Sequence, residues 1–220
     1  DAGDMLDLGG TAAIRAVEGG SRRVMLDLAG TVAGLAPENV RPALDGRSEM
    51  IGSAVIDPAG RIAIEGLNLK TAGVGLALVG TLDIRAGTGK LAFDIVGGDA
   101  SRFAGLMPDL AWNSLRLHAE VDGKLAAPTV DATLTAEDLK ANAYGAATVA
   151  VKATTRPQAD GSLALAVDGN AGGLSAGDTK VAEALGKAAR FTLAGSVSPP
   201  PMSRSTHSTW TSPATRRRRP

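Results

Sequence analysis

The stretch that decides the fold class is residues 115–134, LRLHAEVDGKLAAPTVDATL. In its first half apolar residues alternate with polar ones, and the apolar set is Leu115, Leu117, Ala119, Val121 and Leu125. A period of two is typical of a β-strand with one face against apolar groups and the other in water. We therefore predict a half-buried strand.

The alternation changes phase once within this stretch. After Ala126, Ala127 and Pro128 the apolar set resumes at Val130, one residue out of step. The chain must bend or bulge there if a single face is to stay apolar. Pro128 cannot donate a hydrogen bond to a strand ladder, so we predict a corner at this residue.

The core pattern of the stretch, apolar-any-apolar-any-Gly-any-apolar, occurs six times. The copies are residues 6–12, 26–32, 76–82, 119–125, 165–171 and 191–197. In each copy the glycine has the parity of the apolar residues, so it should leave a gap on the apolar face. Such gaps would let the face curve or admit a ligand, whereas the ordinary alternative is that the glycines mark bulges and bends.

Composition limits what can fill a core. The chain has 220 residues, of which 28 are glycine and only 3% are aromatic, so small aliphatic residues must form the interior. The absence of cysteine excludes disulfides and thiolate metal sites. The formal charge is zero, but residues 199–220 hold five arginines and no acidic residue. A nucleic-acid partner would depend on this tail alone, and we expect none.

The rest of the chain predicts one repetitive β-segment, residues 1–198, followed by a disordered Pro/Ser/Thr/Arg tail, residues 199–220. Further strands are expected at 50–56, 62–69 with a break at Gly66, 74–84, 91–95, 149–151 and 163–171. A short helical turn or a loop is expected at 37–44, and short helices are expected at 100–113, where the helix would plug or cap the sheet edge, and at 181–189. The segments at 37–44 and 181–189 lie about 140 residues apart, and each precedes a strand that contains Gly-Ser. This long repeat favours an extended repeat architecture.

The residues needed for catalysis do not gather in the sequence. His118 and His207 are the only histidines; the first is expected to be solvated on the polar face of its strand, and the second lies in the tail. Carboxylates alternate singly with apolar residues, which keeps a sheet soluble. We therefore expect no catalytic, cofactor or metal site and no enzymatic activity.

A resemblance to a known family appears in residues 117–132, LHAEVDGKLAAPTVDA. Its Gly123, Leu125 and Pro128 resemble the recurrent Gly-x-Leu-x-x-Pro phrase of TamB, the inner-membrane component of the translocation and assembly module, and of its AsmA-like relatives. Residues 35–84 and 99–110 are also similar to that family. The resemblance extends over residues 1–197.

The resemblance implies an all-β fold: an extended, repetitive, antiparallel-type sheet curved into an open, taco-like groove, with short helices between repeats. It implies a bridge across the periplasm of a Gram-negative bacterium, anchored in the inner membrane. Such a protein carries phospholipids between the inner and outer membranes and supports outer-membrane protein assembly or secretion beside an Omp85-type barrel. The chain begins at Asp1 and has no run of about 18 apolar residues. We therefore expect an interior piece of a longer protein that carries the anchor and the family's C-terminal domain.

Acyl chains are the expected ligand of the apolar groove. The residues expected to face the lipid are Leu76, Leu78, Leu82, Leu115, Leu117, Ala119, Val121, Leu125, Leu165 and Val167. The main alternative is a structural or adhesive β-solenoid surface protein with a dry core, for which the unequal spacing of the six copies is atypical. A third class, a β-helical enzyme, would need clustered acidic or basic residues that the sequence does not show.

Overall fold

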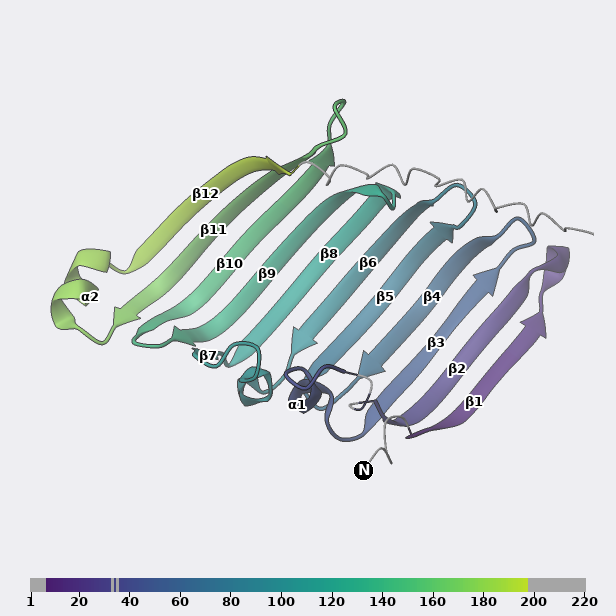
Figure 1. Cartoon of the computed structure of the whole chain (residues 1–220), viewed down its shortest axis with the longest axis horizontal. Coiled ribbons are helices and arrows are strands. Elements are labelled where there is room, and N and C mark those ends of the chain that lie inside the picture. Colours follow the sequence, from purple (N-terminus) through teal and green to yellow (C-terminus); the bar gives the residue numbers. More distant parts are fainter. Residues whose placement is uncertain (1–6, 33, 35, 198–220) are drawn as a thin grey trace, which may run out of the picture.

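The computed structural model describes residues 7–32, 34 and 36–197, and the predicted tail lies outside them. The described residues form one twelve-stranded antiparallel sheet (Figure 1). Its strands are β1 (Asp7–Ala16), β2 (Arg22–Thr31), β3 (Ser48–Ile56), β4 (Arg61–Lys70), β5 (Val74–Asp83), β6 (Thr88–Gly97), β7 (Leu110–Ala111), β8 (Ser114–Lys124), β9 (Ala127–Ala141), β10 (Tyr144–Pro157), β11 (Leu163–Ala176) and β12 (Ala188–Val197).

The strands follow one another across the sheet in chain order. The path runs β1-β2-β3-β4-β5-β6-β8-β9-β10-β11-β12, and the short β7 lies off it, paired with β9. Within the described residues β1 and β12 pair with one neighbour each, so the sheet is open. The prediction of an all-β, extended antiparallel sheet is confirmed.

The connections differ between the two ends of the strands. At one end they are turns, such as the predicted turn at residues 57–60, where the Asp57 carboxylate accepts hydrogen bonds from the Arg61 backbone N–H and Nε, both at 2.8 Å. The bond from the backbone N–H is the main cause that lowers the pKa of Asp57. At the other end lie the predicted short helices α1 (Arg41–Leu44) and α2 (Thr179–Leu185) and a 3-10 turn at Ala100–Phe103 (Figure 1).

A small buried cluster, which we call the end cap, closes the strand ends near α1. Ala43 of α1 is 1% exposed, and its carbonyl accepts hydrogen bonds from Gly73 N and Thr71 Oγ1. Arg102 Nη1 donates to the Pro42 carbonyl. Trp112, also buried, donates from Nε1 to the Gly98 carbonyl at 3.0 Å and packs on Phe103 with ring centroids 5.3 Å apart.

The predicted helix at 100–113 is wrong. Only Ala100–Phe103 is helical, as a 3-10 turn, and Leu110 and Ala111 pair with Ala141 and Lys140 of β9. The apolar spacing that suggested a helix falls on a turn, in which the Leu106 and Met107 N–H groups donate to the Phe103 carbonyl before the chain extends into β7. This segment covers the ends of strands and not the sheet edge.

The phase change after Lys124 is a hairpin and not a bend within one strand. Lys124 pairs with Ala127 across a two-residue turn, and Pro128 pairs with Gly123 inside β9. Pro128 is therefore not the corner. By contrast, the predicted break at Gly66 is confirmed, because the register of β4 shifts around this residue against both β3 and β5.

Candidate functional site: an apolar sheet face without a cover

One face of the sheet is apolar from edge to edge. Directly opposite residues of antiparallel strands point to the same side, so the register assigns the faces. One row across β5, β6, β8, β9 and β10 is Leu76, Ile95, Leu117, Leu134 and Val151. The next row is Leu78, Phe93, Ala119, Ala132, Ala153, Val167 and Leu193. We call this surface the apolar face.

All the predicted lipid-facing residues within strands lie on this face, although they do not form one patch. Those of β5 and β8 are separated by β6, and those of β8 and β11 by β9 and β10. Leu125 lies in the turn after β8 and is 46% exposed, but its Cδ2 extends over Gly89.

The predicted set of lipid-facing residues left out those on the intervening strands, although these strands carry the same alternation and two of them were expected, at 91–95 and 149–151. The missed residues include Leu91, Phe93, Ile95, Val130, Leu134 and Val151. Their period of two was visible in the sequence, but the glycine motif selected other strands.

No described segment covers the apolar face. Among residues whose side chains are described, the buried apolar ones are Trp112 and four alanines, and every leucine, isoleucine, valine and phenylalanine is at least partly exposed. Leu117, Val121 and Leu134 are half-buried, and their cover comes from neighbours in the same layer. A dry core would bury these side chains completely, so this face is accessible from one side.

The motif glycines have three different surroundings. Gly10 and Gly80 have φ of +146° and +140°, and a Cβ there would collide with the carbonyl oxygens of Asp27 and Lys90 on the next strand. The Phe191 ring lies over Gly169. Open space lies above Gly123 and Gly195. The predicted gap is therefore present at Gly123 and Gly195 and absent at Gly10, Gly80 and Gly169.

Hollows occur on both faces. On the apolar face, a hollow of about 140 Å³ between β2, β3 and β4 is lined mainly by Val24, Leu26, Gly52, Ala54, Ile64 and Leu67. Larger depressions, of about 340 to 550 Å³, lie on the opposite face between long side chains such as Lys90, Lys152 and Arg190. Those depressions are open spaces between charged residues, so they do not continue the apolar surface.

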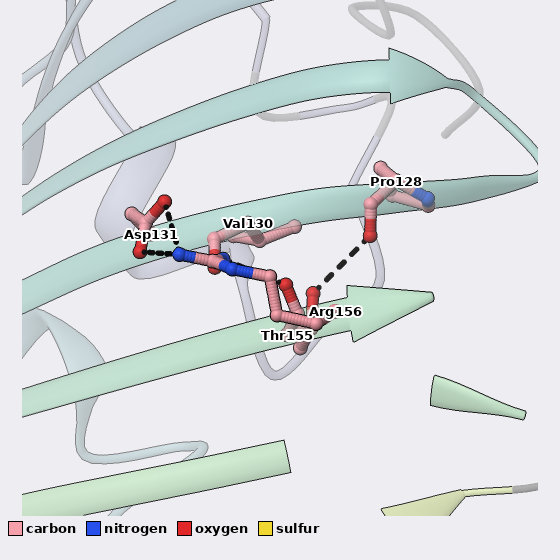
Figure 2. A network of polar contacts seen from close by, with 5 residues as sticks. All are labelled: Pro128, Val130, Asp131, Thr155 and Arg156. Atoms are coloured by element: carbon pink, nitrogen blue, oxygen red, sulfur yellow. Dashed lines mark hydrogen bonds and ion pairs between the residues drawn. The ribbon is translucent and has the colours of Figure 1, made fainter. Parts of the chain in front are cut away.

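The opposite face is polar and crossed by ion pairs, although Ile51, Val79 and Val96 are also exposed there. Arg156 of β10 donates from Nη2 to both carboxylate oxygens of Asp131 in β9, at 2.7 and 3.0 Å (Figure 2). It also donates from Nη1 to the Val130 and Thr155 carbonyls. These exposed contacts join neighbouring strands, and each contributes less than about 1 kcal/mol to the free energy of unfolding.

His118 is half exposed on this polar face, but it is not simply solvated as predicted. Its Nδ1 lies 2.8 Å from Oδ1 of Asp94 on β6, and Nε2 lies 3.8 Å from Oε1 of Glu120. The hydrogen bond to Asp94 is the main cause that raises the pKa of His118 above 6.5. This group stabilises the β6–β8 pair electrostatically.

The described residues contain no group of three or more His, Cys, Asp or Glu side chains that could hold a metal ion. None of the helices in the described part of the chain has the length and apolar character needed to cross a membrane. The apolar face is therefore the candidate functional site of the described residues.

Comparisons of the chain with protein-family models, with curated proteins and with solved structures find no match.

Proposed function

We propose that this chain is a segment of a bridge protein that carries phospholipid acyl chains along its apolar face between the inner and outer membranes. The observation that supports this function is the continuous apolar face that no described segment covers. Exposed apolar surface of this extent on a folded domain is typical of a binding surface.

The dimensions of the face suit an acyl chain. A ten-residue strand such as β5 is about 33 Å long, whereas one lipid chain spans half of a hydrocarbon core of about 30 Å. Each methylene removed from water contributes roughly 0.8 kcal/mol. A chain lying across several rows would thus be held without any specific polar contact, which allows it to move from row to row.

The setting is proposed from the resemblance of residues 117–132 to the TamB and AsmA-like family. In this proposal the parent protein is anchored in the inner membrane and crosses the periplasm of a Gram-negative cell. It also supports outer-membrane protein assembly or secretion beside an Omp85-type barrel.

The adhesive alternative depended on a β-solenoid with a dry core. The described strands instead form an antiparallel meander whose apolar side chains remain partly exposed. No observation on the described residues favours adhesion over lipid binding.

A matched pair of substitutions in the parent protein tests the proposal. Leu117→Glu places a charge on the apolar face and should stop lipid transfer, because desolvating an unpaired carboxylate costs several kcal/mol. His118→Glu, one residue away on the polar face, should leave transfer intact. Thermal unfolding of both variants separates loss of transport from loss of fold.

A photo-crosslinking amino acid at position 117 identifies the occupant. Adducts with phospholipid in a folded, functional variant support the proposal. Adducts with protein alone in that variant would overturn it.

A further inference from the structure

The strand at one edge of the described sheet, β12, has little of the usual protection against pairing, with Arg190 as its one charged residue. Among the described residues it pairs with β11 alone, over Ala188–Val197. It contains no proline, lysine or acidic residue, and these are the residues that commonly blunt sheet edges. Phe191, Leu193 and Val197 alternate along it, and they are 49%, 58% and 57% exposed.

We propose that β12 is a dimerisation edge that pairs with β12 of a second copy of this chain. A two-fold axis perpendicular to the sheet makes the two β12 strands antiparallel. The same rotation keeps the apolar faces of both copies on one side. The product is a single continuous sheet, and this inference does not depend on the lipid function.

Strand direction favours this arrangement over a head-to-tail array. Direction reverses at every step of the path from β1 to β12, so these two edge strands run the same way. A translated copy would bring β1 to β12 as a parallel pair, which is slightly less stable per residue.

The sequence of β12 is self-complementary when the axis passes beside Leu193. Each Phe191 then lies opposite Gly195 of the other copy, above which the isolated chain has open space. The Phe191 ring itself lies over Gly169 of β11, so Gly195 opposite it leaves the ring in place and adds no clash. Arg190, the one charged residue of the strand, lies opposite Ser196, so like charges do not meet.

Disulfide trapping in the full 220-residue chain tests both the edge and the register. The chain has no cysteine, so single cysteines report unambiguously. Directly opposite residues of an antiparallel pair have Cα atoms about 4.5 to 5.5 Å apart, within the range that a disulfide spans. Leu193→Cys should form a covalent dimer under mild oxidation, and Thr192→Cys, which in this register lies opposite Ala194 and not opposite itself, should form much less.

Two control variants distinguish other modes of association. Ile14→Cys on β1 is at a residue even more exposed than Leu193, and Ala119→Cys lies in the middle of the apolar face. Both should stay as thiols. Crosslinking through Ile14→Cys would show pairing at the wrong edge, and crosslinking through Ala119→Cys would show face-to-face stacking; either result in place of Leu193→Cys overturns the proposal.

Sedimentation of Leu193→Lys completes the test. Lysines facing each other across the axis should convert the dimer to a monomer, while Ile14→Lys should leave the dimer unchanged. A wild-type chain that sediments as a folded monomer at micromolar concentration would contradict the proposal.

Discussion

At the scale of single residues, two glycines of the same motif differ in whether their position could accommodate a side chain. Gly80 has φ of +140° and lies against the Lys90 carbonyl, whereas Gly195 has ordinary extended geometry and open space. We expect Gly80→Ala to lower the free energy of unfolding by about 1 to 3 kcal/mol. Gly195→Ala should change it by less than about 0.5 kcal/mol. Urea denaturation of both variants measures the difference, and equal effects would show that Gly80 is not strained.

His118 gives a second prediction at this scale. Its pKa is raised above 6.5 by the Asp94 hydrogen bond, so the protonated imidazole is the form that stabilises the fold. The contribution is fully present below pH 6.5 and is lost as the pH rises through the raised pKa. NMR titration should show that Asp94→Asn lowers the pKa of His118 and flattens this pH dependence. An unchanged pKa in the variant would mean that the contact is absent in solution.

At the scale of elements, the end cap replaces a conventional core. Trp112 is 8% exposed, so Trp112→Ala should cost about 3 to 5 kcal/mol of stability. Trp112→Phe loses only the bond to the Gly98 carbonyl, which is worth about 0.5 to 1.5 kcal/mol. Tyr144→Ala, at a residue 54% exposed, is the control and should be nearly neutral. Thermal unfolding monitored by circular dichroism orders the three variants, and a neutral Trp112→Ala would contradict the role of the cap.

The strands and helices also show which parts of the fold the sequence alone could predict. The period of two predicted the strand at 115–124 and its faces, because burial on one side imposes alternation directly. The same pattern could not distinguish a hairpin from a bulge at Ala127 and Pro128, since both shift the phase by one residue. The helical spacing within 100–113 predicted one helix, whereas the chain forms a 3-10 turn at Ala100–Phe103 and then the short strand β7. Cross-strand contacts such as Phe191 over Gly169 depend on register, which no local pattern specifies.

At the scale of the whole molecule, the fold separates two surfaces across one layer. Rows of aliphatic side chains lie on one face, and ion pairs such as Arg23–Glu65 at 2.7 Å cross the other. A single layer cannot bury its own apolar face, so this surface of the described residues is open to a ligand or a partner. The lipid proposal assigns this cover to acyl chains, and the paired β12 edges would widen the surface without closing it.

Contact of acyl chains with the apolar face, and not with the polar one, can be measured directly on the purified chain. Fluorescent labels on Leu117→Cys and His118→Cys lie one residue apart on opposite faces, and phospholipids with brominated acyl chains quench a label that they touch. Acyl chains bound to the apolar face should quench the label strongly at position 117 and little at position 118, with both variants folded. Equal quenching at the two positions, or none at position 117 in a folded chain, would contradict the lipid proposal.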